Sequence, residues 1–309
     1  MPGKARIAVI GAGLMGHGIA QVFAVAGHDV TITDPFEAAR DAVHEKVTQN
    51  LKDMGKPLQA VQRIAVMPDN ASTVANADVV IEAAPENMEL KQKLFAELEQ
   101  HAPASAILAS NTSVMPITEI MKNLKDRTRA VGTHWWNPPF LVPLVEVIRT
   151  ADTSDATVST MMDLLAGAGK TPVEVKKDVP GFVGNRLQHA LWREAIAIVA
   201  EGICDADMVD TVVKASFGRR LPVLGPLENA DMVGTDLTLA IHQQVLPYID
   251  RTPGPSPYLE KLIADGKLGF KAGEGFRKWS VEEQAALRKK VIDHLMAMDR
   301  KDSQDGENQ

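Results

Sequence analysis

The feature that most constrains this chain is the alternation, over residues 1–150, of short apolar runs with longer amphipathic segments. The runs are mostly apolar throughout, as strands covered by helices on both faces should be. The segments between them repeat apolar residues at helical spacing, as Val43, Val47 and Leu51 do. This alternation predicts an α/β fold with a doubly wound parallel sheet. The expected strands are Arg6–Ile10, Val30–Thr33, Val79–Glu82, Ile107–Ser110, Ala130–Thr133, Leu144–Ile148 and Pro172–Val175.

The second part of the chain has a different character. From Phe182 onward the apolar pattern is helical only, which predicts an all-α C-terminal domain. Pro180 and Gly181 mark the change, and 309 residues are enough for about two domains. We therefore expect a sheet domain over residues 1–180 and a helical domain over residues 181–309. The expected helices are Arg186–Glu201, Asp207–Ala215, a stretch after Pro226, Pro257–Ala264 and Val281–Met298.

A glycine-rich G-x-G-x-x-G pattern directly follows the first expected strand. Its glycines permit a tight turn and a close approach of the backbone to a pyrophosphate at the N-terminus of the next helix. Asp34 ends the second expected strand, where a carboxylate would bind a ribose diol and disfavour the extra phosphate of NADP. The pattern predicts a Rossmann-type NAD site, and the alternative is a glycine-rich turn without a ligand. The loop residues expected to bind NAD are Gly11, Gly13, Leu14, Met15 and Gly16.

A charged residue in an apolar strand points to a second site. Glu146 lies inside the run Leu144–Ile148, where an ionised carboxylate is costly to bury without a partner. His134 follows the strand Ala130–Thr133, and the turn at Pro138 and Pro139 can fold the chain back to pair the two side chains. A carboxylate on one ring nitrogen fixes the tautomer that a general base requires. The alternative is a surface glutamate on an edge strand and a structural histidine.

Two other polar residues fall at expected element ends. Ser113 follows the strand Ile107–Ser110, on the side where open parallel sheets bind ligands. Its hydroxyl could donate to a substrate oxygen or cap the following helix. Asn185 lies at a loop-to-helix junction, where it could face a cleft between the domains or act as an N-cap.

Composition excludes several classes of partner. The net charge of −7 would be repelled by a nucleic-acid duplex or an anionic membrane surface. The single cysteine, Cys204, rules out an intrachain disulfide and a thiolate metal cluster, and we expect no metal. The apolar stretch from Ile7 to Gly27 could pass for a signal peptide, but its glycines are better explained by the NAD loop. We expect a cytoplasmic protein without a membrane span.

With these residues assembled, the chain resembles the 3-hydroxyacyl-CoA dehydrogenase family from Ile7 to about Trp279. The segments that carry the resemblance are VIGAGLMGHGIA at 9–20, IEAAPENMELK at 81–91, SNTS at 110–113, THWWNPPFLVPLVEVI at 133–148, DVPGFVGNR at 178–186 and KAGEGF at 271–276. The resemblance implies an NAD-dependent dehydrogenase that oxidises a secondary alcohol, and a homodimer formed through the helical domain.

The resemblance also implies a role for each matching residue. His134 would be the catalytic base, Glu146 its orienting partner, and Ser113 and Asn185 would hold the substrate oxygen. The positions that would contact the cofactor are Glu86, Lys91, Ser113, Asn137 and Lys271.

The sequence departs from the acyl-CoA members in two places. Residues 36–63 are short where those members carry a longer helical hairpin, and residues 216–226 form a longer, basic turn. The turn and the segment NRLQHALWREA at 185–195 are similar to the gulonate dehydrogenase/lambda-crystallin and pyridine-carboxylate dehydrogenase branches, and His-Trp-Trp replaces the usual His-Phe-Phe. Arg219 or Arg220 could then bind a substrate carboxylate, although both could equally be solvated surface charges.

The substrate is therefore expected to be a small molecule, and its class stays open between acyl-CoA and free acid. The leading interpretation is oxidation of a 3-hydroxyacyl group to 3-oxoacyl. One alternative is a dehydrogenase of a free carboxylate-bearing hydroxy acid or hydrated aldehyde, with Arg220 binding the carboxylate. Another is a non-catalytic NAD-binding structural protein, as the lens crystallins of this family are.

Overall fold

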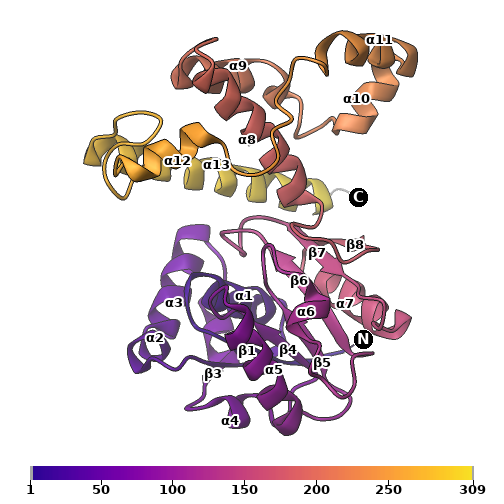
Figure 1. Cartoon of the computed structure of the whole chain (residues 1–309). Coiled ribbons are helices and arrows are strands. Elements are labelled where there is room, and N and C mark those ends of the chain that lie inside the picture. The colour runs from indigo at the N-terminus through magenta and orange to yellow at the C-terminus, as the bar shows by residue number, and fades with distance from the viewer. Residues whose placement is uncertain (1–2, 308–309) are drawn as a thin grey trace. The chain divides into compact units, whose positions relative to one another are not determined.

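The computed structural model describes residues 3–307. By their contacts they form two compact units, which we call the sheet unit (residues up to Asn185, and those from Asp293) and the helical unit (Arg186–Ile292). Both are drawn in Figure 1. The boundary expected between residues 180 and 181 stays a prediction, because compact units and independently folding domains are different properties.

The sheet unit contains one eight-stranded sheet in the order β3-β2-β1-β4-β5-β6-β7-β8. All neighbouring strands are parallel except β6 and β7, which pair antiparallel. The predicted fold class, a doubly wound sheet with a helical C-terminal part, is confirmed. The short strand β3 and the reversed direction of β7 were not expected from the sequence. The strands are β1 (Arg6–Ile10), β2 (Asp29–Thr33), β3 (Ile64–Val66), β4 (Val79–Glu82), β5 (Ile107–Ser110), β6 (Ala130–Trp135), β7 (Leu144–Ile148) and β8 (Thr171–Val175).

Helices cover both faces of the sheet (Figure 1). Successive strand residues point to opposite faces, so Val9 packs into one core and Ile10 into the other. Helices α1, α3 and α7 complete the first core, and α4, α5 and α6 the second. The helices are α1 (Leu14–Val25), α2 (Glu37–Asp41), α3 (Val43–Met54), η1 (Leu58–Arg63), α4 (Asn70–Val74), α5 (Met88–His101), α6 (Ile117–Ile120) and α7 (Asp155–Gly167).

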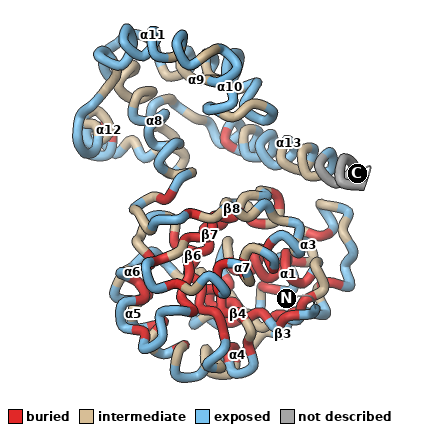
Figure 2. The backbone as a smooth tube through the Cα atoms, turned by 90° about the vertical axis from the view of Figure 1, so that its right-hand side faces the viewer, coloured by how far each residue is buried: buried red, intermediate tan, exposed pale blue. Residues whose placement is uncertain are grey.

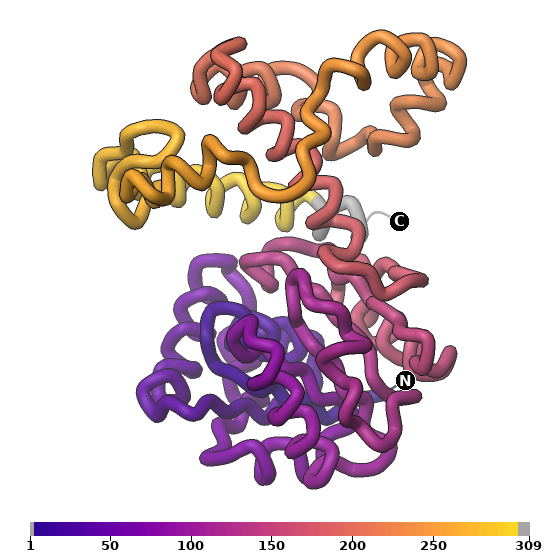
Figure 3. The backbone as a smooth tube through the Cα atoms, viewed as in Figure 1, coloured from indigo at the N-terminus to yellow at the C-terminus, as the bar shows by residue number. Residues whose placement is uncertain are grey.

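The helical unit contains no strand of three or more residues, and Figure 3 follows its chain from red through orange to yellow. Of residues 186–292, only Leu262 and Gln284 are buried, as the pale tube of Figure 2 shows. No described helix is long and apolar enough to cross a bilayer. The elements here are α8 (Gly184–Ala200), α9 (Ala206–Ala215), η2 (Phe217–Arg219), α10 (Pro226–Val233), α11 (Thr235–Val245), α12 (Pro257–Ala264) and α13 (Val281–Glu307), whose first and last residues fall in different units.

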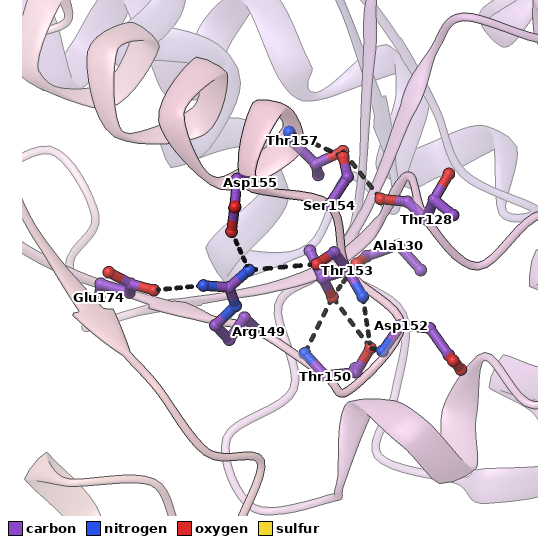
Figure 4. A network of polar contacts seen from close by, with 10 residues as sticks. All are labelled: Thr128, Ala130, Arg149, Thr150, Asp152, Thr153, Ser154, Asp155, Thr157 and Glu174. Atoms are coloured by element: carbon purple, nitrogen blue, oxygen red, sulfur yellow. Dashed lines mark hydrogen bonds and ion pairs between the residues drawn. The ribbon is translucent and has the colours of Figure 1, made fainter.

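A polar network fixes the end of β7 (Figure 4). Arg149, directly after the strand, forms ion pairs with Asp155 at the start of α7 and with Glu174 of β8. The Thr153 hydroxyl donates to the Ala130 carbonyl at the start of β6 (2.7 Å). The network joins three strands and a helix, and so holds in place the strand that carries Glu146.

Candidate functional site

The loop between β1 and α1 has the shape that an anion site requires. Gly11 has φ +104°, and a Cβ there would lie 2.7 Å from the Ala83 carbonyl oxygen. A Cβ on Gly16 would lie 1.7 Å from the Gly11 carbonyl oxygen, so neither position tolerates a side chain. Gly13 faces open space, and the first turn of α1 contains no acidic residue and no side-chain cap. The N–H groups of Leu14 and Met15 at this turn therefore suit the pyrophosphate of NAD.

Asp34 lies beside this loop, directly after β2. Its Oδ2 accepts a hydrogen bond from the Ala12 amide (2.8 Å), and its Oδ1 accepts one from the Phe36 amide (3.0 Å). Each carboxylate oxygen has two lone pairs, so the carboxylate keeps capacity for a ribose diol. The structure thus brings Asp34 next to the glycine loop, as an NAD site of this type requires.

A buried ion pair closes the carboxyl ends of β4 and β5. The Lys91 ammonium donates to Oε1 of Glu82 (2.6 Å), and both side chains are at most 1% exposed. Ser110 donates its hydroxyl to the other oxygen of Glu82 (2.6 Å). Glu86 is 3.6 Å from Lys91 and accepts hydrogen bonds from the Ser113 amide and the Thr112 hydroxyl. The structure therefore joins Glu86, Lys91 and Ser113 in one cluster.

Glu82 is the residue of this cluster that the sequence reasoning missed. It ends an apolar strand, and its burial becomes evident only with Lys91 on α5 above it. The available signal was an acid closing a buried strand with a lysine nine positions later in a helix. An isolated carboxylate in such a strand is costly to bury, so a partner was to be expected.

The antiparallel pairing of β6 and β7 brings His134 and Glu146 together. The two residues are direct cross-strand partners, and His134 Nδ1 lies 2.7 Å from Glu146 Oε2. Glu146 Oε1 accepts hydrogen bonds from the amides of Val183 (2.9 Å) and Gly184 (3.0 Å). β7 lies between β6 and β8, so the edge-strand alternative for Glu146 is wrong.

The surroundings of Glu146 keep it ionised. Burial by itself would raise the pKa of Glu146, but the hydrogen bonds from His134, Gly184 and Val183 outweigh it and hold the pKa below its ordinary value. A carboxylate in this state only accepts hydrogen bonds, so Nδ1 of His134 carries the hydrogen. The lone pair of Nε2, for which no hydrogen bond is found among the described residues, is then available to accept a proton.

Two aromatic rings enclose the imidazole. The Trp136 ring centroid lies 5.1 Å from that of His134, and the Phe182 centroid lies 5.6 Å away. The histidine side chain is only 4% exposed. Low solvent access strengthens the interaction between the imidazole and the Glu146 carboxylate.

Asn185 and Ser113 are also joined. The Asn185 side-chain amide donates to the backbone carbonyl of Ser113 (2.7 Å), and Gly184, next to Asn185, contacts Glu146. Asn185 belongs to the sheet unit by its contacts. The Ser113 hydroxyl and the Asn137 side chain have no hydrogen-bond partner among the described residues. The sheet unit therefore contains the His134–Glu146 pair together with polar groups that are unpaired among the described residues.

Three expected residues belong to the helical unit. Arg219 and Arg220 lie at η2, and both are exposed. Lys271 is exposed as well, in the segment after α12. None of the three side chains has an ion pair within the described part of the chain. Among residues 3–307, no group of three or more His, Cys, Asp or Glu residues is arranged to hold a metal ion.

Comparison with known families gives two matches. Residues 6–179 match the model of the 3-hydroxyacyl-CoA dehydrogenase NAD binding domain, and residues 181–279 match that of the 3-hydroxyacyl-CoA dehydrogenase C-terminal domain. The long helix α13 begins after both matches end.

Comparison with individual proteins gives relatives of two kinds. The chain is 34% identical over 300 residues to a 5-formyl-3-hydroxy-2-methylpyridine 4-carboxylate 5-dehydrogenase of Mesorhizobium japonicum, covering 96% of this chain and 97% of the relative. It is 38% identical to the human mitochondrial hydroxyacyl-coenzyme A dehydrogenase, covering 89% and 91%.

Two crystal structures are similar. One, of an NAD⁺-dependent 5-dehydrogenase of the same pyridine carboxylic acid, superposes with a TM-score of 0.89 at 32% identity, covering 96% and 98% of the two chains. The other, of (S)-3-hydroxybutyryl-CoA dehydrogenase from Ralstonia eutropha, gives 0.75 at 34% identity, covering 90% and 100%.

Proposed function

Because the chain belongs to the 3-hydroxyacyl-CoA dehydrogenase family, we propose that it oxidises the alcohol of a 3-hydroxyacyl group to a ketone with His134 as general base. The chain is an NAD-dependent oxidoreductase. The observation that carries the proposal is the buried hydrogen bond of 2.7 Å between His134 and Glu146, which leaves one ring nitrogen free to accept a proton.

The proton path follows from this geometry. Nε2 of His134 takes the hydroxyl proton of the substrate, and the resulting imidazolium lies against the Glu146 carboxylate. The carboxylate is fixed in turn by two backbone amides, so the charge pair forms without reorganisation. NAD, when bound, would accept the hydride from the substrate carbon that carries this hydroxyl group.

Ser113 and Asn185 are proposed to hold the reacting oxygen. The Ser113 hydroxyl is unpaired among the described residues, and Asn185 uses one N–H on the Ser113 carbonyl, which ties the two together. A primary amide has a second N–H, so both residues can donate to an oxygen that becomes a carbonyl. This placement would orient the alcohol toward the base.

We propose cofactor contacts for the remaining site residues. The amides of the Gly11–Gly16 loop would bind the pyrophosphate, and Asp34 the adenosine ribose. Glu86 and Lys91 would contact the cofactor from the β4 end, and Asn137 would lie beside the nicotinamide. Lys271 is proposed as a further contact from the helical unit.

A second candidate function is oxidation of a free carboxylate-bearing hydroxy acid or hydrated aldehyde. The pyridine-carboxylate dehydrogenase favours it, because that relative matches 96% of the chain, and the crystal structure of such an enzyme superposes with a higher TM-score than that of the 3-hydroxybutyryl-CoA dehydrogenase. In this case Arg220 would bind the carboxylate, with Arg219 beside it. Arg220→Ala should then raise KM for the acid far more than it weakens NAD binding, and equal effects would exclude the role.

The substrate class is tested by NADH formation from NAD with two matched panels. One contains short and medium 3-hydroxyacyl-CoAs, and the other the corresponding free hydroxy acids, with sugar acids and pyridine carboxaldehydes added. We expect turnover with the thioesters. Turnover confined to the free compounds would contradict the thioester proposal and support the second candidate. NADH binding without turnover in either panel would favour a non-catalytic NAD-binding protein instead.

We also propose a cytoplasmic homodimer that associates through the helical unit. The support is the exposure of large apolar side chains there, among them Val223, Leu227 and Leu239. A hollow of about 630 Å³ in this unit, lined by apolar residues such as Trp192 and Phe276 and by charged residues that include Lys271, adds to this uncovered surface. Surface of this kind marks association sites. Sedimentation of the whole chain should give twice the monomer mass, and a monomer at micromolar concentration would contradict the proposal.

A further inference from the structure

Lys170 is a half-buried lysine in the turn between α7 and β8. Its ammonium donates hydrogen bonds to the backbone carbonyls of Pro139 (2.5 Å) and Val142 (3.2 Å). It also lies 5.9 Å from the ring centroid of Trp135. All three contacts fall on residues 135–142. We call these residues the connecting segment, because they run from the last residue of β6 toward β7. The candidate cofactor contact Asn137 lies within this segment.

Within the connecting segment, no backbone amide donates to the carbonyls of Pro139 and Val142, and the lysine is their donor. The Pro138 carbonyl already accepts the amides of Leu141 and Val142 (both 3.0 Å), which closes the turn on itself. The carbonyls of Pro139 and Val142 converge instead on one ammonium. A carbonyl removed from water without a donor is destabilising, so an apolar residue at position 170 would leave both without their partner.

The connecting segment also packs against α1. A Cβ on Gly18 would lie 3.0 Å from Pro139 and 3.3 Å from Phe140, so the helix and the segment are in close contact there. The helix that follows the glycine loop and the segment that carries Asn137 are thus in direct contact. Movement of the segment would change the position of Asn137 relative to the cofactor loop.

We propose that Lys170 is a positioning residue that fixes the connecting segment, and with it Asn137, for the bound cofactor. The inference rests on the proposed cofactor role of Asn137. Lys170 does not act on the substrate, and its effect is transmitted through the two carbonyls it binds.

The charges around Lys170 come from elsewhere in the sheet unit. The connecting segment and the last turn of α7 contain no ionisable side chain. The carboxylate of Asp299 in α13 attracts the Lys170 ammonium electrostatically and also lies 3.6 Å from Lys56. Burial lowers the pKa of Lys170 to about 8, and Asp299 partly opposes this. The ammonium therefore loses its charge between about pH 7 and 9, where its hold on the carbonyls weakens.

The test compares Lys170→Met, which keeps the length but removes the donors, with Lys170→Arg and with the control Lys176→Met. Lys176 is exposed and lies directly after β8. Hydrogen exchange is measured on the whole chain at pH 7, and NADH affinity by fluorescence titration from pH 7 to 9. We expect Lys170→Met to speed exchange of the Leu141 and Val142 amides roughly tenfold or more, and to weaken NADH binding severalfold.

Three further results separate positioning from general stability. Lys170→Arg should keep most of the NADH affinity, because it keeps the charge and donors. The wild-type affinity should fall above about pH 8, whereas that of Lys170→Met should not. The losses caused by Lys170→Met and Asn137→Ala should not add, since both act through one segment.

The proposal is overturned if exchange in the connecting segment is unchanged, or if it rises equally throughout the sheet unit. It is also overturned if the two losses of NADH affinity add fully. If Lys170→Met does not fold, Lys170→Arg and the pH dependence of wild-type NADH affinity decide the matter. None of these readouts requires turnover, so a failure of the proposed dehydrogenase reaction would be recognised separately.

Discussion

The sheet unit and the helical unit differ in how far each buries its own residues. Red segments fill the sheet unit in Figure 2, whereas only Leu262 and Gln284 are buried among residues 186–292. The polar side chains differ in the same way. Glu82, Lys91, His134 and Glu146 are nearly inaccessible. The ion pairs of the helical unit lie mostly at its surface.

This difference shows in which unit the roles of polar side chains can be inferred from their contacts. In the sheet unit the buried charged side chains of Glu82, Lys91 and Glu146 each have a definite partner, so their orientation follows from contacts. In the helical unit Arg219, Arg220 and Lys271 have no ion pair among the described residues, and their roles depend on what they meet when substrate or a second copy is present. Buried pairs should therefore be sensitive to substitution, and exposed pairs tolerant.

The largest effect on stability is expected at the buried pair. Glu82→Gln removes the nearer of the two carboxylates beside the buried Lys91 ammonium and leaves Glu86 at 3.6 Å, which should destabilise the sheet unit by about 3–5 kcal/mol. The matched change in the helical unit is Asp207→Asn. It removes the charge of a carboxylate that pairs with Arg277 and is 68% exposed. That change should cost less than about 1 kcal/mol. Urea unfolding monitored by hydrogen exchange in each unit measures the loss in free energy of unfolding for both variants. Equal losses would contradict the difference between the two units.

A smaller effect is expected from leucine truncation. Leu51 of α3 is fully buried, so Leu51→Ala should destabilise the sheet unit by about 2–5 kcal/mol. Leu239 of α11 is 59% exposed, and Leu239→Ala should cost within about 0.5 kcal/mol at a dilution where the chain is monomeric. A large cost at Leu239 under these conditions would mean that the helical unit has a core of its own.

The smallest effect is a dependence on pH. Because the pKa of Glu146 is lowered on folding, its contribution to stability is complete above its ordinary pKa of 4.5 and is lost as the pH falls below that value. Wild type should lose stability below pH 4.5 more steeply than Glu146→Gln. In the helical unit the hydrogen bond from Lys267 lowers the pKa of the partly exposed Glu274, and salt should screen that effect more than the one at the buried Glu146. Parallel acid curves for wild type and Glu146→Gln would contradict this.

The sequence predicted those parts of the molecule that local pattern determines. Strands such as β4 and β5 are continuous apolar runs, and they lie where expected. The pairing of His134 with Glu146 was also foreseeable, because a turn joins the two strands that carry them. In each case residues close in sequence set the outcome.

The rest depended on long-range packing. The strand β3 has only three residues and emerges through its pairing with β2. The burial of Glu82 depends on Lys91 of α5 lying over it, and Lys170 contacts carbonyls about 30 residues away. Helices α9 and α10 were expected from their patterns, but whether their apolar faces are covered could not be derived, because that depends on groups outside the unit.

The measurement that tests the central claim most directly is turnover and NADH binding by His134→Ala. The substrate is (S)-3-hydroxybutyryl-CoA or free 3-hydroxybutyrate, whichever the wild type oxidises. If His134 is the base that Glu146 orients, kcat should fall roughly 10³-fold while the Kd for NADH changes by no more than about twofold. Unchanged turnover, or a loss of NADH affinity as large as the loss of rate, would contradict the account.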